Sequence, residues 1–163
     1  IEGRKQAMLA IEALRRYTPG CERARLRNFG MTIGIRDTRK IDAVYNLTEH
    51  DVRNQARFDD TIGIYPEFID GYGILMLPTT GRYLHLPYRA LLPKKIRNLL
   101  IAGRSIGGDR IAHAATRNMS CCAVVGQAAG VAAAVSVRDG RDFWEIDIPR
   151  VQAEIERQGV RIR

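Results

Sequence analysis

The chain has 163 residues and a formal net charge of +8, and 45% of its residues are hydrophobic. This length suffices for one domain with a sizeable core, and the composition is that of a packed protein rather than a disordered one. No apolar run approaches the roughly 20 residues that cross a bilayer, and no signal peptide is evident. We therefore expect a cytoplasmic protein without a membrane span.

The distribution of basic residues and cysteines excludes further classes. Lysine and arginine are scattered along the chain without interleaved aromatic residues, so nucleic-acid binding is not favoured. The three cysteines are Cys21, Cys121 and Cys122, an odd number without metal-ligand spacing. We expect neither a disulfide framework nor a metal site.

The amino-terminal third predicts two helices and two strands. Apolar residues recur every three or four positions over residues 3–17, which indicates an amphipathic helix. Imperfect alternation over 24–35 and 41–47 predicts a pair of strands joined by a charged turn. Thr48, with Asp51 three residues later, has the pattern of a capped helix start.

The middle of the chain predicts a loop and then a hairpin. Aromatic, glycine and acidic residues between 58 and 73 follow no clear period, so this stretch is interpreted as a loop. Residues 74–77 and 83–86 are predicted strands, and the Pro-Thr-Thr-Gly stretch at 78–81 is a plausible hairpin connection between them.

The carboxy-terminal part has the strongest apolar signals. A short continuous apolar run at 98–102 is typical of a buried parallel strand. Residues 119–137 are almost all small or apolar, with Gly126 and Gly130 four positions apart, and predict a buried helix packed closely on its neighbours. A final amphipathic helix is predicted over 148–158.

Several residues in this part could carry chemistry. A helix that begins near Ser120 offers free backbone N–H groups and a positive dipole end, which suit a phosphate or the electron-rich edge of a reduced flavin. His113 could donate or accept a proton, or could be a hydrogen-bonded loop residue. Cys121 and Cys122 resemble a redox pair, but adjacent cysteines rarely form a bridge, so we interpret them as packing residues.

Two arginines in the predicted turn at 36–39 could bind a substrate carboxylate. Arg36 and Arg39 lie three positions apart, and their planar guanidinium groups suit bidentate hydrogen bonding. The equally weighted alternative is a structural ion pair with Asp37, Asp42 or an acidic partner surface.

Taken together, these segments resemble the carboxy-terminal signature of a bacterial family of FAD-dependent oxidoreductases, whose cofactor fold is glutathione-reductase-like. The resemblance runs from about residue 34 to residue 134. Each matching element alone is a weak signal, and only their combination is specific. The elements of the carboxy-terminal signature are Leu86-Pro87-Tyr88-Arg89, Asn98-Leu99-Leu100-Ile101-Ala102-Gly103-Arg104, Ala112-His113, Arg117 and Gly126-Gln127-Ala128-Ala129-Gly130. The upstream run Gly34-Ile35-Arg36-Asp37-Thr38-Arg39-Lys40-Ile41, with Leu47-Thr48 and Asp51, resembles the substrate-domain segment of the same family.

The resemblance implies an α/β fold in which residues 88–163 complete a Rossmann-like FAD domain, and residues 1–87 contribute strands of a substrate domain. It implies FAD as the cofactor and hydride transfer between a small organic substrate and the flavin. It implies that His113 and Arg117 lie near the substrate side of the flavin ring, and with Arg36, chosen for its guanidinium chemistry, these are the candidate catalytic residues. The implied cofactor-binding residues are Gly103, Arg104, Ser105, Met119, Ser120, Cys121 and Cys122.

One motif of the family is missing from this sequence. No GxGxxG follows a predicted strand, although the family carries this pyrophosphate-binding motif at its amino terminus. We therefore expect a partner chain that carries the motif, or a missing amino-terminal half, in an oligomeric assembly. The alternative is a non-catalytic basic interaction or assembly module with a degenerate flavin-like core.

Overall fold

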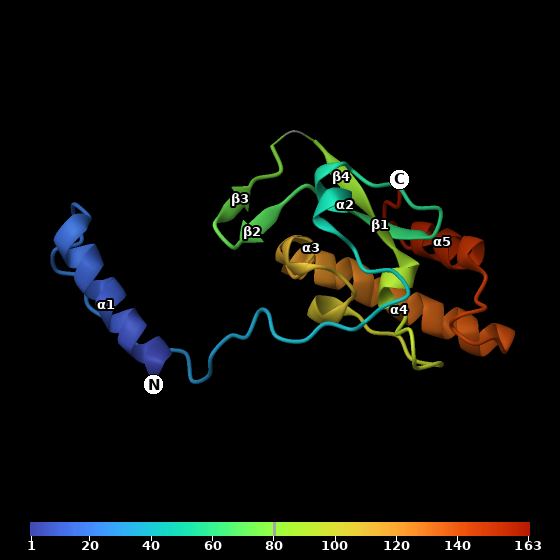
Figure 1. The fold of residues 1–163 in the computed structure, drawn as a ribbon, viewed down its shortest axis with the longest axis horizontal. Helices are drawn as coiled ribbons and strands as arrows, with labels where there is room; N and C mark the ends of the chain where they lie inside the picture. Colours follow the sequence, from blue (N-terminus) through green and yellow to red (C-terminus); the bar gives the residue numbers. More distant parts are fainter. Residues whose placement is uncertain (80) are drawn as a thin grey trace. The chain divides into compact units, whose positions relative to one another are not determined.

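The computed structural model describes residues 1–79 and 81–163. The chain divides into two compact units, Ile1–Ile35 and Arg36–Arg163, which are described separately (Figure 1). The predicted boundary between residues 87 and 88 falls inside the second unit, where strand β4 (Tyr83–Pro87) meets the short helix η1 (Tyr88–Leu91). The assignment of the two segments to a substrate domain and an FAD domain stays a prediction.

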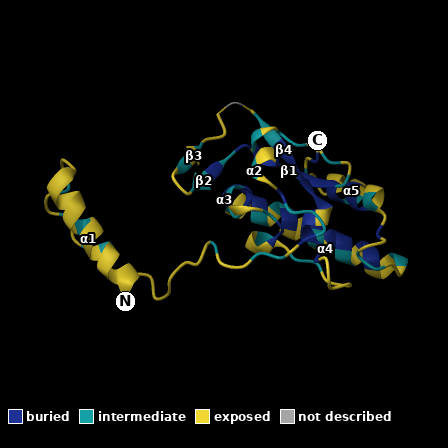
Figure 2. Cartoon of the chain, viewed as in Figure 1, coloured by how far each residue is buried: buried dark blue, intermediate teal, exposed yellow. Residues whose placement is uncertain are grey.

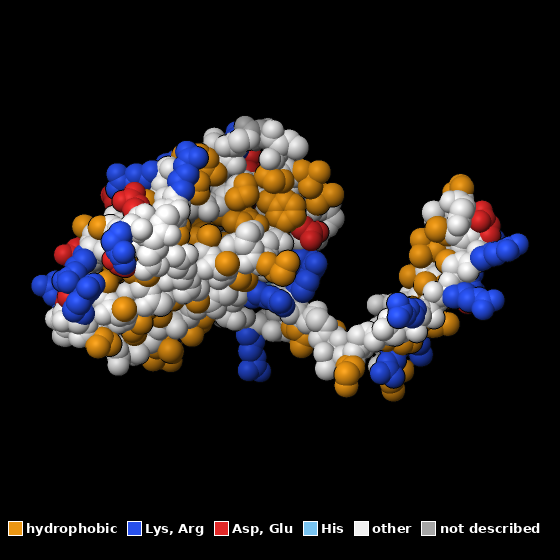
Figure 3. Space-filling view, turned by 180° about the vertical axis from the view of Figure 1, so that it is seen from behind, with side chains coloured by type: hydrophobic (Ala, Val, Ile, Leu, Met, Phe, Trp, Pro, Cys, Tyr) orange, Lys and Arg blue, Asp and Glu red, His pale blue; other side chains and the backbone are white. Residues whose placement is uncertain are grey.

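The first unit is dominated by α1 (Glu2–Tyr17), the helix expected from its periodicity. None of its residues is buried (Figure 2), and apolar side chains are visible on its surface (Figure 3). The predicted strand at 24–35 is wrong, because this stretch is irregular. Alternation of apolar and polar residues stabilises a strand only when another strand completes its hydrogen bonds, and the described residues supply none here.

The second unit begins with an extended segment and the short helix α2 (Glu49–Arg53). The predicted strand at 41–47 is also wrong, since this segment makes only isolated bridges, from Ala43 to Pro93 and from Leu47 to Gly108. The capped helix start is confirmed: the Thr48 and Asp51 side chains each accept a hydrogen bond from the other residue's backbone N–H.

Four strands form two antiparallel pairs, one nested inside the other along the chain. The outer pair joins β1 (Thr61–Pro66) to β4, and the inner pair joins β2 (Ile69–Gly71) to β3 (Ile74–Met76) (Figure 1). The predicted loop at 58–73 is therefore wrong. Because β1 is buried along most of its length, it has no alternating pattern that could have revealed it.

The predicted hairpin is correct in its strands and wrong in its pairing. β3 and β4 occupy the expected positions, but each pairs with a strand from the stretch that was interpreted as a loop. The proposed turn at 78–81 contains Thr80, which lies outside the described residues.

The predicted parallel strand at 98–102 is wrong as well. The segment is irregular, Asn98 adopts a left-handed backbone with φ 54°, and Leu99 is exposed. Among the described residues, one backbone hydrogen bond, from the N–H of Ile101 to the carbonyl of Leu91, joins the segment to the rest of the unit, and Leu100 packs against the core. A buried strand needs neighbouring strands to complete its backbone hydrogen bonds. Within the described ranges 1–79 and 81–163, no strand lies beside residues 98–102.

The core of the second unit is built around α4 (Met119–Asp139) and α5 (Ile148–Arg157), the two carboxy-terminal helices that were predicted. α4 packs on β1 and on α5, and its buried stripe includes Val125, Ala128 and Val131. The Asp147 side chain caps α5 by accepting a hydrogen bond from the N–H of Arg150. The expectation that no apolar run approaches the length of a membrane span is wrong, because α4 has the length and hydropathy of one. Core helices of soluble proteins pass the same test.

The close helix packing expected at Gly126 and Gly130 is not found within the unit. A Cβ built on either glycine would meet no described atom within 4 Å. The tight contact lies instead at Gly63 of β1, where a Cβ would approach Cγ1 of Val124 to 2.3 Å. α4 therefore rests on a strand glycine, while its own glycines face outward.

The second unit thus combines helices with small antiparallel sheets, which is consistent with an α/β fold. A Rossmann-like sheet is not among the described strands, and completion of an FAD domain by residues 88–163 remains an expectation.

Candidate functional site

A short helix that sequence analysis missed, α3 (Arg110–Thr116), carries the central residues of the candidate site. The Asp109 side chain caps it by accepting hydrogen bonds from the N–H groups of Ile111 and Ala112. Arg110 and His113 lie three positions apart, and Arg117, the residue that ends the helix, follows four positions later. This spacing places the three side chains on one face. The prediction of a loop at His113 is therefore wrong.

His113 is buried, with 2% of its surface exposed, and its two ring nitrogens have different surroundings. Nε2 lies 3.1 Å from the backbone carbonyl oxygen of Arg104. Nδ1 has no hydrogen-bond partner among the described residues and lies 3.6 Å from Oδ1 of Asp37. Burial, with the nearby charges of Lys40 and Arg117, lowers the pKa of His113 although Asp37 opposes this shift.

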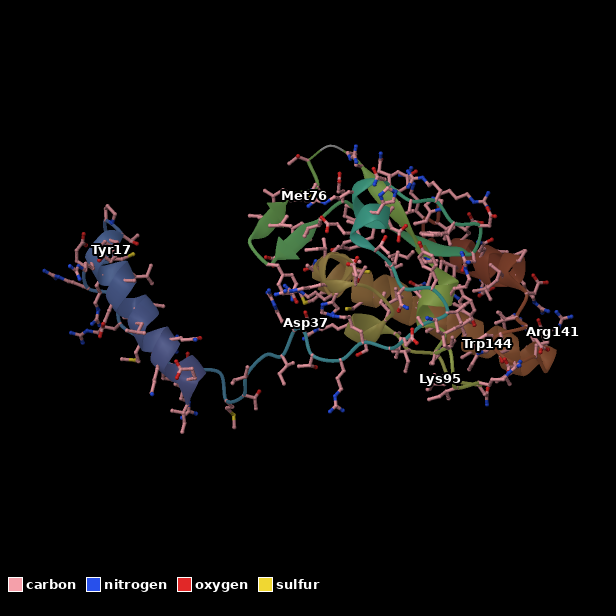
Figure 4. All side chains as sticks on the ribbon, in the orientation of Figure 1. Tyr17, Asp37, Met76, Lys95, Arg141 and Trp144 are labelled. Carbon is pink, nitrogen blue, oxygen red and sulfur yellow. The ribbon has the colours of Figure 1, made fainter. Side chains whose placement is uncertain are left out.

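Asp37 connects this histidine to two other side chains. Nζ of Lys40 donates a hydrogen bond of 3.1 Å to Oδ1, and the hydroxyl of Tyr72 donates to Oδ2. Burial alone would raise the pKa of Asp37, but the hydrogen bond from Lys40 and the positive charges around it outweigh burial and lower the pKa. Figure 4 labels Asp37 where its segment passes α3 and β2.

The turn between β2 and β3 brings Tyr72 into the site. Tyr72 has φ 57°, a left-handed conformation that is uncommon for a residue with a large side chain and that recurs at functional sites. Cζ of Arg110 lies 3.8 Å from the centroid of the Tyr72 ring, within the range of a cation–π contact. The turn and α3 thus hold the phenol beside Asp37.

Arg36 and Arg117, two of the predicted catalytic residues, meet at Asp70. Nη2 of Arg117 donates a 2.6 Å hydrogen bond to the Asp70 carbonyl, and Nη1 of Arg36 lies 3.7 Å from Oδ2 of the same residue. Arg36 therefore forms an exposed ion pair, with a different aspartate from those expected. Sequence reasoning missed Asp37, Lys40, Asp70, Tyr72 and Arg110 as members of the site.

The predicted cofactor-binding residues fall on two neighbouring elements. Gly103, Arg104 and Ser105 form the short helix η2 (Gly103–Ser105), which packs against α4. Gly103 has φ 77° and no described atom within 4 Å of a built Cβ, so its backbone is open to a close approach.

The amino terminus of α4 is exposed and lacks a side-chain cap. The Asn118 side chain makes no hydrogen bond to the first turn, and its amide donates instead to the carbonyls of Ala114 and Ala115. Met119 is 87% exposed and Ser120 is also exposed. First-turn N–H groups with no intrahelical acceptor are suited to an anionic or electron-rich group.

The two thiols at this helix start point toward the protein. Cys121 is completely buried, and Sγ of Cys122 lies 3.6 Å from the carbonyl oxygen of Arg117. Burial raises the pKa of both thiols, so they stay protonated at neutral pH. Any contribution of Cys121 to a ligand would come from its backbone.

The comparisons with known proteins identify the protein family. The family model for FAD dependent oxidoreductase matches residues 1–155, and the chain belongs to this family. The match implies FAD as the cofactor. Searches of the curated proteins and of the solved structures found no match.

The described residues fit this cofactor in their chemistry. An uncapped helix start, a left-handed glycine with open space and a buried imidazole acceptor are concentrated between Gly103 and Ser120. In the part of the chain that the structure describes, no three His, Cys, Asp or Glu side chains are grouped to hold a metal ion.

Proposed function

We propose that the chain is a component of a cytoplasmic oxidoreductase that transfers a hydride between a small organic substrate and FAD. One observation supports this proposal most strongly. The hydrogen-bond distance between His113 and the Arg104 carbonyl joins the predicted substrate-side residues to the predicted cofactor-side residues. When bound, FAD would supply the hydride acceptor or donor, and the chain would supply positioning groups and proton transfer.

The exposed residues of η2 and the start of α4 are the groups that would hold the cofactor. The N–H groups of Met119 and Ser120 would donate hydrogen bonds to the electron-rich edge of the flavin. Gly103 would let the cofactor come close to the protein backbone. Cys121 and Cys122 would shape this end of the helix through packing.

On the other side, Arg117 and Arg36 would orient the substrate. Both lie at Asp70, and their remaining guanidinium N–H groups are suited to a carboxylate or carbonyl oxygen. His113 would hold or release a proton during the reaction, because its Nδ1 is an acceptor without a donor.

We also propose that a polypeptide with a GxGxxG motif completes the FAD site, as a partner chain or as the amino-terminal half of the same protein. Supporting evidence is the outward face of α4, where Met119 and Val137 are largely exposed and both helix glycines are open. Apolar helix faces of this kind usually mark a contact surface.

The test is co-expression of the chain with a GxGxxG-bearing polypeptide encoded beside it. We expect a co-purifying complex with a flavin absorption spectrum, and native mass spectrometry would give its stoichiometry. If neither a partner nor a longer form of the protein binds FAD, the proposal is wrong. Salt-sensitive binding to polyanions without flavin would instead support the non-catalytic module.

A further inference from the structure

We infer that Tyr72 and Asp37 control the protonation of His113: a ligand oxygen that takes the Tyr72 hydroxyl away from Asp37 would cause His113 to take up a proton. In this arrangement Asp37 is a positioning residue, and Tyr72 is the group that contacts the ligand. The inference rests on the proposed function for the identity of that ligand as the substrate.

The tautomer of His113 follows from its neighbours. A carbonyl oxygen can only accept, so the Nε2 atom that faces the Arg104 carbonyl must carry the proton. Nδ1 of the neutral ring then presents a lone pair, and it faces Oδ1 of Asp37, which is also an acceptor. The 3.6 Å between them is longer than a hydrogen bond, and a proton on Nδ1 would turn this contact into an ion pair.

The charge that Asp37 presents to His113 depends on its other contacts. Lys40 donates to Oδ1 and Tyr72 donates to Oδ2, and each bond reduces the pull of the carboxylate on a proton at Nδ1. The positive charge of Arg117 also opposes protonation of His113. Loss of the Tyr72 hydrogen bond therefore strengthens the attraction of Asp37 for the protonated imidazole.

Tyr72 is the most exposed of Tyr72, Asp37, Lys40 and His113, and so the one a ligand reaches most easily. Its side chain belongs to a residue that is 39% exposed, whereas His113 is 2% exposed. The left-handed backbone of the turn and the stacked guanidinium of Arg110 hold the phenol in place. A carboxylate or carbonyl oxygen attracted by Arg110 and Arg117 would compete with Asp37 for the phenolic hydrogen.

The proton balance is simple. The ligand accepts the hydrogen bond of Tyr72 without a proton transfer, and one proton from solvent binds Nδ1 of His113. The imidazolium and the Asp37 carboxylate then form an ion pair without net charge, and the charge of Asp37 offsets the cost of burying a charged imidazole. The reverse exchange releases the proton when the ligand leaves.

The test is a pH titration of the full chain by long-range ¹H–¹⁵N NMR of its three histidines. In the wild type we expect Nδ1 to be unprotonated at neutral pH. Tyr72→Phe, which mimics loss of the hydrogen bond to Asp37, should raise the titration midpoint of His113 by about half a pH unit, and Asp37→Asn should lower it by about one unit or more. Lys40→Gln should raise it.

The matched control is Tyr45→Phe, which removes a similar hydrogen bond from a tyrosine hydroxyl to the Asp51 carboxylate. It should leave the His113 midpoint unchanged. An Nδ1-protonated tautomer in the wild type, or a His113 midpoint that is unchanged or lower in Tyr72→Phe, would overturn the inference. Should Asp37→Asn unfold, Tyr72→Phe and Lys40→Gln still decide the question. Because the titration needs neither flavin nor a partner, its failure is distinguishable from failure of the proposed function.

Discussion

The carboxylate of Asp109 joins two helices, since its Oδ2 accepts a 2.7 Å hydrogen bond from the backbone N–H of Glu49 while its Oδ1 caps α3. Glu49 is the first residue of α2 and lies sixty positions earlier in the sequence. One side chain therefore satisfies helix-start donors in both α2 and α3. The position of His113 depends on this contact, because α3 begins at the next residue.

Replacement of Asp109 by alanine should destabilise the protein more than loss of an ordinary cap. We expect Asp109→Ala to lower the free energy of unfolding by about 1–3 kcal/mol, because three backbone N–H groups lose their acceptor. Asp147→Ala is the control, since Asp147 makes a single 3.3 Å cap bond, to Arg150. Urea denaturation of both variants measures the difference, and equal losses would contradict the double role.

A second prediction concerns Gly107, which packs against the 41–47 segment and precedes α3 in the sequence. A Cβ at Gly107 would lie 2.4 Å from Cβ of Ala43 and 2.9 Å from the carbonyl oxygen of Tyr45. Gly107→Ala should therefore cost about 1–3 kcal/mol in unfolding free energy. At the neighbouring Gly108 the nearest atom would be 3.4 Å away, so Gly108→Ala should cost less. Thermal melts of the two variants test this order.

Stability should fall with pH on the acid side of neutrality. Burial lowers the pKa of His113 and His85 below the usual 6.5, so the unfolded chain binds more protons than the folded chain once the pH drops below about 6.5. The contribution of both residues is complete above that pH and is lost as the pH falls toward their folded-state values. Denaturant titrations at several pH values give the unfolding free energy as a function of pH. Its slope on the acid side should be shallower in His113→Gln than in the wild type. An unchanged slope would show that His113 does not contribute.

The first turn of α4 offers a test of flavin contact in the loaded complex. Asn118 has ψ 151°, which is compatible with a following proline, so Met119→Pro should remove one N–H group without disturbing the helix. We expect the flavin reduction potential to fall by about 20 mV, corresponding to about 1 kcal/mol for one hydrogen bond. Met119→Ala keeps the N–H and serves as the control. Identical potentials in both variants would exclude this donor.

The outward glycines of α4 give opposite expectations for folding and for assembly. Gly126→Leu should stabilise the isolated chain by about 1 kcal/mol, because leucine favours a helix over glycine and a Cβ at this position meets no described atom within 4 Å. The same change should prevent assembly with the GxGxxG-bearing polypeptide by blocking close approach. Gly126→Ala should stabilise the chain and still assemble. Co-purification yields compare the variants, and full assembly of Gly126→Leu would place the partner elsewhere.

Local signals in the sequence were sufficient for some elements and not for others. The Thr48–Asp51 cap and the periodicity of α1 and α5 depend on neighbouring residues, and these predictions are confirmed. β1 is buried on both faces, so no alternation marks it. The apolar run at 98–102 has the composition of a strand, but no described strand lies beside it to pair with.

Local sequence signals also predicted only part of the candidate site. The spacing of Arg110, His113 and Arg117 fits one helix face and could have been recognised once α3 was assigned. The contact between Asp37 and Tyr72 spans 35 positions and depends on a left-handed turn, which no local pattern specifies. Long-range contacts of this kind become visible only in the folded chain.

The nesting of the two strand pairs also has a kinetic consequence. The inner pair of β2 and β3 closes over a turn of a few residues, whereas the outer pair must join strands separated by the whole inner hairpin. Closing the short loop first lowers the entropy cost of the long one, so the inner hairpin should form before β1 meets β4. The turn that carries Tyr72 would then be in place early in folding, ahead of the sheet on which α4 packs.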